Sequence, residues 1–383
     1  MSSYYFDTTT DEQKYKENAK GAQKLLELTV SSGSRWGGEH LKACHVVVNS
    51  KVGDCLPLLK SYDRTIRKTF ERGKGNTHIA AFIQDLAPKH ENMRQHALVR
   101  EPEVGASLAR FWAALRDVKK LKSDEEKQES KQRTSGRVRT QTTHAGYVNS
   151  ELIASSSQGH EDSPNSSFST STSSYTPAQR PATQLPVELY TVELAFAAIN
   201  HILLYTQDPS LDTPVEIRQP ERWSIQITNK RITAIDDGGL TLIKNGGEKT
   251  GKSVVLIEAK RRLNVCDKTD RPSVPDEQLG QMACEAIAAR SSMQGDKGSD
   301  DIFLINATQH YMCFFHFNIT ADHLEDLGHG RIPDNAIKVT TTRWFNLESP
   351  TGRKCIVKNV LQLAEYMGQM EGEEKDPLPL PDL

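Results

Sequence analysis

The sequence predicts an α/β protein whose C-terminal domain has a mixed central sheet flanked by helices, with a mostly helical N-terminal region and a disordered linker before it. After residue 185, helix-spaced apolar residues alternate with short β-branched runs, a pattern typical of a sheet covered by helices. Between residues 155 and 174, ten of twenty residues are serine. Such a segment buries too little apolar surface to offset the entropy of ordering it.

Composition divides the 383 residues into three regions. Residues 1–118 mix apolar patches with charge, and two helices are predicted there, over 11–30 and 107–118. Residues 119–184 open with a charge run and then become rich in serine, which predicts a disordered linker. Residues 185–383 form the predicted α/β domain. Hydrophobic residues make up only 36% of the chain, as expected if part of it is unfolded.

Bulk features exclude several classes of protein. The net charge of −2 gives no global basic field of the kind that marks many nucleic-acid binders. The six cysteines are scattered without a CxxC pair, which argues against a zinc ribbon or a disulfide framework. The polar N-terminus does not resemble a secretory signal. The sequence has no run of about 18 apolar residues, so no membrane span is predicted. We therefore expect an intracellular protein, cytoplasmic or nuclear, and no feature predicts its protein partners.

The elements of the C-terminal domain follow from its periodicities. Apolar residues recur at helical spacing over 187–205, and strand-type runs cover 223–235, 240–243 and 253–260. A hairpin-type loop is predicted at 245–251. A helix over 275–290 begins with proline and aspartate. Two strands joined by a turn occupy 301–319, and a β-like stretch at 338–347 precedes a helix at 360–369.

Two carboxylates and a lysine stand out at the end of one strand. Glu258 and Lys260 follow a run of four apolar residues and share one face of the strand, because side chains alternate along it. Asp237 lies 21 residues earlier, across one predicted hairpin, which places it about 5 Å from Glu258 on the neighbouring strand. Carboxylates that close repel unless a cation lies between them, and oxygen ligands favour Mg²⁺ or Mn²⁺ over zinc.

This arrangement resembles the core of the PD-(D/E)XK nucleases, in which a helix, an Asp-bearing hairpin, a strand ending in (D/E)-x-K and a second helix follow one another. The resemblance covers about residues 187–319, and the segments VVLIEAKRR and QLGQMACEAIAAR also resemble uncharacterised fungal members. The family's proline before the aspartate is absent, because Ile235 and Asp236 stand there. Asp236 therefore remains an alternative to Asp237.

The resemblance implies metal-assisted hydrolysis of phosphodiester bonds in DNA or RNA. Asp237 and Glu258 would hold Mg²⁺ or Mn²⁺ with the help of the Ala259 carbonyl, and Lys260 would position the attacking water. It also implies a helical glutamate near the metal, for which Glu193 is the candidate. A side chain from the second helix is the other implied addition, with Gln278 and Gln281 as candidates.

Other interpretations of the same residues remain open. Gln278, Gln281 and Glu285 form one helical stripe that is also typical of a solvent-facing surface. Arg261 and Arg262, next to the triplet, are candidates for contact with nucleic acid. Alternatively, Glu258 or Asp237 forms a structural salt bridge with Lys260 or Arg261. In that case the domain is an inactive module that binds nucleic acid or protein.

A rival motif predicts an NTPase. Residues 246–253 match the phosphate-binding pattern G-x-x-x-x-G-K-[ST]. That pattern works because a helix follows and points its N-terminal amides at the phosphate. Here Val254–Ile257 form a strand-type run instead. The sequence therefore favours the metal-dependent nuclease over the inactive module, and both over the P-loop NTPase.

Overall fold

The computed structural model describes residues 4–28, 32–49, 52–63, 77–133, 187–244, 247–249, 254–260, 263–266, 271–293 and 299–372. One compact unit is made of Met1–Leu121 together with Val187–Leu383. Residues 4–118, which composition sets apart as an N-terminal region, thus lie in the same compact unit as the predicted α/β domain.

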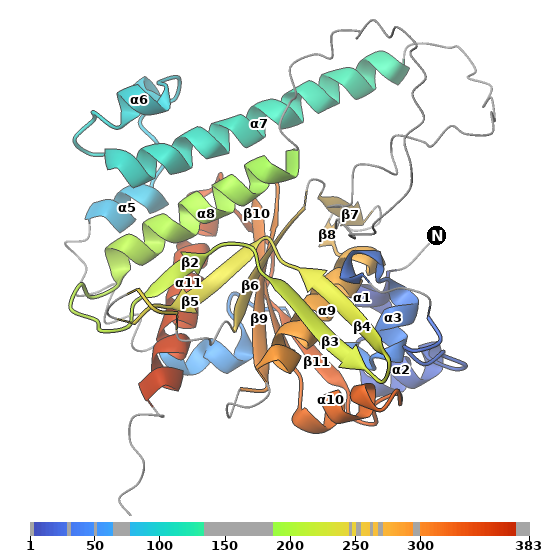
Figure 1. Cartoon of the computed structure of the whole chain (residues 1–383). Helices are drawn as coiled ribbons and strands as arrows, with labels where there is room; N and C mark the ends of the chain where they lie inside the picture. Colours follow the sequence, from blue (N-terminus) through green and yellow to red (C-terminus); the bar gives the residue numbers. More distant parts are fainter. Residues whose placement is uncertain are drawn as a thin grey trace, which may run out of the picture. The chain divides into compact units, whose positions relative to one another are not determined.

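An eight-stranded mixed sheet forms the centre of this unit among the described residues (Figure 1). Its two parallel pairs are β6 with β9 and β1 with β11, and its other pairs are antiparallel. The strands lie in the order β1 (Val46–Val48), β11 (Ile337–Thr341), β10 (Tyr311–Asn318), β9 (Asp301–Thr308), β6 (Val255–Lys260), β5 (Gly238–Leu242) and β2 (Val215–Arg218), and β12 (Phe345–Asn346) pairs with β10. The predicted α/β class with a mixed sheet flanked by helices is confirmed.

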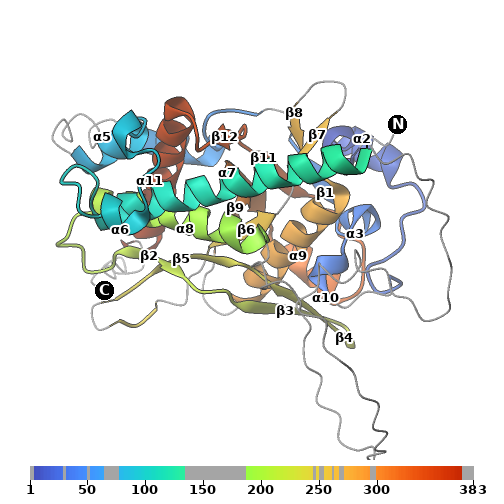
Figure 2. The ribbon, with the colours of Figure 1, turned by 90° about the horizontal axis from the view of Figure 1, so that it is seen from above.

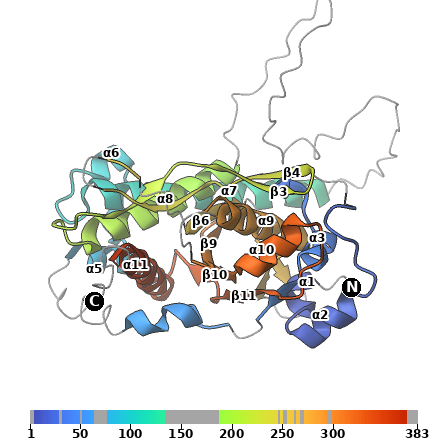
Figure 3. The same ribbon diagram turned by 60° about the horizontal axis from the view of Figure 1, so that its bottom comes forward.

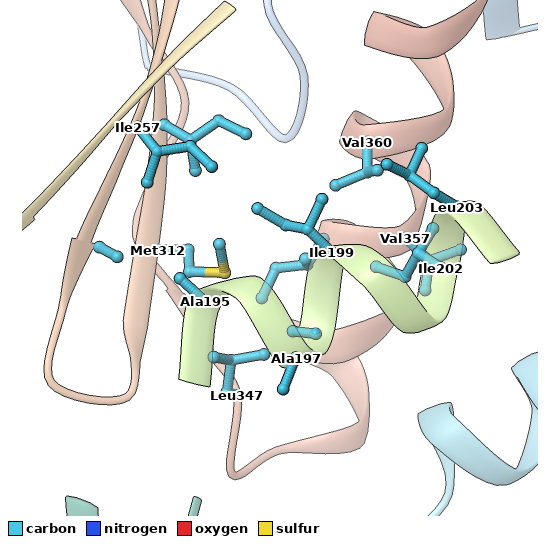
Figure 4. Packing of buried hydrophobic residues seen from close by; sticks show 14 of the residues in the cluster. Ala195, Ala197, Ile199, Ile202, Leu203, Ile257, Met312, Leu347, Val357 and Val360 are labelled. Atoms are coloured by element: carbon cyan, nitrogen blue, oxygen red, sulfur yellow. The ribbon is translucent and has the colours of Figure 1, made fainter. Parts of the chain in front are cut away.

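One face of the sheet is covered by long helices. Apolar residues of α8 (Val187–Thr206) pack between the sheet and α11 (Pro350–Gly372), and Figure 4 shows Ile199 and Ile202 lying toward Val357 and Val360. Helix α7 (Gly105–Arg133) runs beside α8 (Figure 2), where Ser107 Oγ lies 2.6 Å from His201 Nδ1. This face is completed by α5 (Thr77–Ile83), α6 (Gln95–Leu98) and two 3₁₀ turns at Pro57–Tyr62 and Pro88–His90.

The opposite face is covered by α9 (Asp276–Ser292) and α10 (Ala321–Gly328). Helix α9 lies between the sheet and a separate hairpin of β3 (Arg222–Ile227) and β4 (Lys230–Ile235) (Figure 3). The sequence predicted one strand over 223–235, and this was wrong. Thr228 has a positive φ of 49° and begins a tight turn. The β-branched residues on both sides of that turn therefore form a hairpin rather than one strand.

The N-terminal residues pack around α9 and the edge of the sheet. Trp36 is fully buried, and Gly280 of α9 lies so close that an added Cβ would be 2.7 Å from the Trp36 carbonyl carbon. Strand β1 pairs in parallel with β11. The helices here are α1 (Tyr5–Thr8), α2 (Glu12–Asn18), α3 (Gly38–Ala43) and a 3₁₀ turn at Gly33–Arg35. The helix predicted over 11–30 thus ends at Asn18.

Two further expectations, the linker and the absence of a membrane span, can be compared with the structure. Helix α7 continues to Arg133, into the range that composition assigned to a linker, and residues 134–186 lie outside the described part of the chain. A short hairpin of β7 (Asn264–Cys266) and β8 (Arg271–Ser273) follows β6. Glu188–Thr206 is long and apolar enough to span a membrane by length and composition, but half of this window is buried inside the fold. A core helix passes the same test.

Candidate functional site

The β5–β6 pairing brings Asp237 next to Glu258. Gly238 pairs with Ile257 in the antiparallel register, and the Asp237 N–H donates to the Ile257 carbonyl at 3.0 Å. Asp237 therefore stands opposite Glu258, one position beyond the last named pair. The carboxylate of Asp237 accepts the Ala259 N–H at 2.8 Å. The sequence predicted that one hairpin would bring Asp237 and Glu258 side by side, and the β5–β6 register does so.

Asp236 has a different environment, although it is adjacent in sequence. Its carboxylate is buried and accepts two bonds from the Arg218 guanidinium, at 3.0 and 2.5 Å. It also accepts the Trp223 indole N–H at 2.6 Å and the backbone N–H groups of Glu221 and Gly238, each at 3.0 Å. These bonds occupy both oxygens of Asp236. Of the two aspartates, Asp237 is the one available to the candidate site.

Glu258 and Lys260 face the same side of β6, as the strand period requires. Glu258 is 1% exposed, and Lys260, with a side chain 25% exposed, forms an ion pair with it. Lys260 Nζ also lies 3.5 Å from Glu188 Oε1 in the first turn of α8. Glu188 and Asp237 are only partly buried. The group thus has a buried end at Glu258 and a solvent-facing end at Lys260, Glu188 and Asp237.

Helix α9 supplies a polar row that faces the sheet rather than the solvent. Gln278 Nε2 donates to Asn306 Oδ1 at 3.0 Å, and Asn306 is the partner of Glu258 in the parallel β6–β9 register. Gln281 Nε2 donates to Glu285 Oε1 at 3.0 Å, and the fully buried Glu285 carboxyl lies against Glu258. The alternative of a solvent-facing stripe is therefore wrong for Gln278 and Glu285.

Several buried polar atoms in this region lack a hydrogen-bond partner of ordinary geometry among the described residues. They are Glu258 Oε2, Glu285 Oε2 and Asn306 Nδ2. A buried polar atom without a partner is uncommon, because it loses its bonds to water and gains nothing in return. The Glu258 and Glu285 carboxyls can satisfy each other by sharing one proton, whereas Asn306 Nδ2 has no acceptor among the described residues.

The pKa values of the group are shifted because several carboxyls are buried around one ammonium. Burial raises the pKa of Asp237 to about 6, against the opposing effects of the Ala259 N–H and Lys260. Burial likewise raises the pKa of Glu258 to about 8, with Lys260 opposing and Asp237 adding to the rise. Burial, with Glu258 close by, raises the pKa of Glu285 well above its usual value. Burial alone lowers the pKa of Lys260, but Glu258 and Glu188 raise it above normal.

The remaining predicted site residues lie elsewhere or outside the described residues. Glu193 does not join the group, because its carboxylate accepts the Arg110 Nε–H at 2.7 Å on the surface between α8 and α7. The helical glutamate that reaches Lys260 is Glu188 instead. Gln281 is half-buried and reaches the site through Glu285. Arg261 and Arg262 lie outside the described residues.

The P-loop alternative fails on the element that follows the motif. Strand β6 begins at Val255, two residues after the motif ends. Residues 245–246 and 250–253 are outside the described part, and Lys249 forms an isolated bridge with Ile243. A strand at this position presents no helix N-terminus to a phosphate.

Sequence reasoning missed two members of the group. Glu188 was overlooked because a glutamate in the first turn of a helix is common, and the approach of α8 to the end of β6 is a tertiary contact. Asn306 carried a usable signal, since it is one polar residue inside the apolar run Ile302–Ala307. A polar side chain in a strand buried on both faces needs a partner, and here Gln278 provides it.

Comparison with known proteins adds no assignment. No protein-family model matches the chain, and a search of curated proteins finds no match. Among the described residues, no three histidine, cysteine, aspartate or glutamate side chains are already gathered around one point as metal ligands. The case for function therefore rests on the chemistry of Asp237, Glu258 and their neighbours.

Proposed function

We propose that this protein is a divalent-metal-dependent nuclease, with Asp237 and Glu258 as cation ligands and Lys260 as the residue that positions water. One observation carries the proposal. Two carboxyls, Asp237 and Glu258, stand opposite each other on adjacent strands, with Lys260 on the same face as Glu258. Apart from the inserted hairpins β3–β4 and β7–β8, the element order α8–β2–β5–β6–α9–β9 agrees with the PD-(D/E)XK resemblance.

The residues present fit a Mg²⁺ or Mn²⁺ ion. Mg²⁺ is commonly held by one or two carboxylates and keeps several waters, so a ready-made set of three protein ligands is not required. Glu258 is buried beside another carboxyl, that of Glu285, and Asp237 is partly open to solvent. A cation would also relieve the repulsion that burial imposes on these carboxyls. The Ala259 carbonyl is a further candidate ligand.

Each side chain then has a distinct role. When bound, a divalent cation would polarise the phosphoryl oxygen and lower the pKa of a water molecule. Asp237 and Glu258 supply the anionic oxygens that hold it. The Lys260 ammonium, anchored by Glu258 and by Glu188 at 3.5 Å, hydrogen-bonds the attacking water and the phosphate. Arg261 and Arg262 follow Lys260 directly, and we propose that they contact the nucleic-acid backbone.

A second function is favoured by the Glu258–Lys260 ion pair itself. If that pair is purely structural, the domain is an inactive module that binds nucleic acid or protein. The two functions differ in the effect of removing Lys260. A structural pair makes Lys260→Ala destabilising by about 3–5 kcal/mol with no response to metal. A catalytic lysine makes the same change abolish cleavage while leaving the metal site largely intact.

The deciding experiment uses the purified full-length protein with DNA and RNA substrates, in Mg²⁺, Mn²⁺ or chelator. We expect cleavage only with metal, its loss in Lys260→Ala and Glu258→Gln, and wild-type activity in the control Lys354→Ala, an exposed lysine on α11. Thermal melts should show metal stabilising the wild type and Lys260→Ala but not Glu258→Gln. A melting temperature that ignores metal, together with a large loss for Lys260→Ala, would refute the nuclease and favour the inactive module.

A further inference from the structure

Glu285 is a fully buried acid that the proposed chemistry has not used. It lies in the middle of α9, facing β6, and its relative exposure is 0%. Gln281 donates one hydrogen bond to Glu285 Oε1, and in the described part of the chain the other partner of the Glu285 carboxyl is the carboxyl of Glu258, with which it can share a proton. The side chain thus places a carboxyl in the core, where such a group is costly.

The neighbour of Glu285 is a second buried carboxyl. The two acid groups of Glu285 and Glu258 lie in contact. Two carboxyls that touch cannot both be ionised without a positive charge between them, so they share either a proton or a cation. Lys260 pairs with Glu258 Oε1 and leaves the oxygens Glu258 Oε2 and Glu285 Oε2 without such a partner.

An independent observation comes from the adjacent strand. Asn306 stands beside Glu258 in the β6–β9 register and is 0% exposed. Its Oδ1 is held by Gln278 of α9, which turns the amide toward the face that carries Glu285. Its Nδ2 donor has no acceptor among the described residues. A buried donor without an acceptor marks a position for an oxygen atom, such as a water molecule carried by a hydrated cation.

We propose that Glu285 is a third carboxylate ligand of the cation site formed by Asp237 and Glu258, extending that site inward to helix α9. The three carboxyls are not gathered around one point in the metal-free structure, so the cation would displace the proton between Glu258 and Glu285 and draw the side chains together. The inference rests on the proposed function, because it concerns the same cation. Charge supports it. When ionised, Asp237, Glu258, Glu285 and Glu188 carry four negative charges, and the Lys260 ammonium leaves three, of which a divalent cation would balance two. Asn306, held by Gln278, donates to oxygen atoms within the completed site.

The test is calorimetric titration of metal-free, full-length protein with Mn²⁺. Glu285→Gln keeps the size of the side chain and its acceptor for Gln281. We expect it to weaken Mn²⁺ binding by about 10–100-fold. The matched control is Glu277→Gln, which makes the same charge change at an exposed position of α9 and should leave Mn²⁺ affinity unchanged. In the absence of metal, Glu285→Gln should melt at a higher temperature than the wild type.

The outcomes separate this inference from the proposed function. Wild-type Mn²⁺ affinity in Glu285→Gln, with loss of binding in Glu258→Gln, would overturn the inference and leave the nuclease proposal standing. Mn²⁺ binding that requires Glu285 without any cleavage of nucleic acid would support the inference and refute the nuclease. Absence of Mn²⁺ binding in the wild type would overturn both. If Glu285→Gln does not fold, Glu285→Asp retains the charge with a shorter reach, and unchanged affinity in that variant would also overturn the inference.

Discussion

Asp236 and Asp237 are adjacent in sequence but have opposite effects on the stability of the fold. Asp236 neutralises Arg218, whose side chain is fully buried, and ties β2, β3 and the start of β5 together. The Asp237 carboxylate accepts one hydrogen bond, from the Ala259 N–H, and otherwise faces Lys260 and other carboxyls. A carboxylate that compensates a buried guanidinium supports the fold, whereas one placed among other acids opposes it.

The two aspartates should therefore respond differently to neutralisation. Asp236→Asn leaves the buried Arg218 guanidinium with only the partly exposed Glu221 carboxylate, 3.6 Å away, as counter-charge, and we expect it to lower the free energy of unfolding by about 3–5 kcal/mol. Asp237→Asn should leave metal-free stability unchanged or slightly increased. Urea unfolding followed by tryptophan fluorescence measures both. Equal losses in the two variants would show that Asp237 is as structural as Asp236.

The β5–β6 pair depends on two glycines at the start of β5. Gly238 has a φ of +138°, which few other residues adopt, and its Cα faces the ring of Phe196. At Gly239, an added Cβ would lie 2.3 Å from the Val255 carbonyl oxygen and 2.6 Å from Arg218 Nη2. The missing side chain at Gly239 therefore allows β5 to approach Val255 of β6, and the one at Gly238 leaves room for Phe196 of α8.

Gly239→Ala should thus damage the element that positions the site. We expect a loss of about 1–3 kcal/mol in the free energy of unfolding, because backbone atoms must move to admit the methyl group. The matched change Gly368→Ala, at an exposed helical position with open space around it, should stabilise by about 0.5–1 kcal/mol. Chemical denaturation of the two variants compares them directly. A neutral Gly239→Ala would show that β5 tolerates a wider spacing from β6.

At the scale of the whole molecule, the N-terminal residues complete the unit that holds the candidate site. Trp36 packs against Gly280 of α9, and the Tyr5 N–H donates to Asp276 at the start of that helix at 2.6 Å. Strand β1 covers the edge of β11. Helix α9 carries Gln278, Gln281 and Glu285, so the N-terminal segment supports the helix that faces Glu258.

Cutting the chain between residues 140 and 180 should leave the two halves associated. We expect a protein with an inserted protease site there to elute after cleavage as one complex on size exclusion, because residues 1–121 and 187–383 belong to one compact unit. The halves should separate only in denaturant. Separation of folded halves in native buffer would show that the C-terminal part is independent of β1 and Trp36.

The sequence by itself determined the features that depend on local pattern. Periodicity predicted α8, β6, α9 and the β9–β10 pair, because apolar spacing differs between a helix and a strand. It also predicted the side-by-side placement of Asp237 and Glu258, since a hairpin fixes its own register. The strand-type run after Ser253 argued against a P-loop, because it too is a local pattern and leaves no helix to follow the motif.

Only the tertiary structure decided the features that depend on distant segments. A β-branched run does not reveal whether it turns, and so β3–β4 was taken for one strand. The roles of Asp236 and Glu193 depended on Arg218 and Arg110, which approach them only in the folded chain. Glu285 and Asn306 join Glu258 because α9 packs across β6 and β9. Residues far apart in sequence become neighbours through packing of apolar surfaces, and no local pattern records which surfaces will meet.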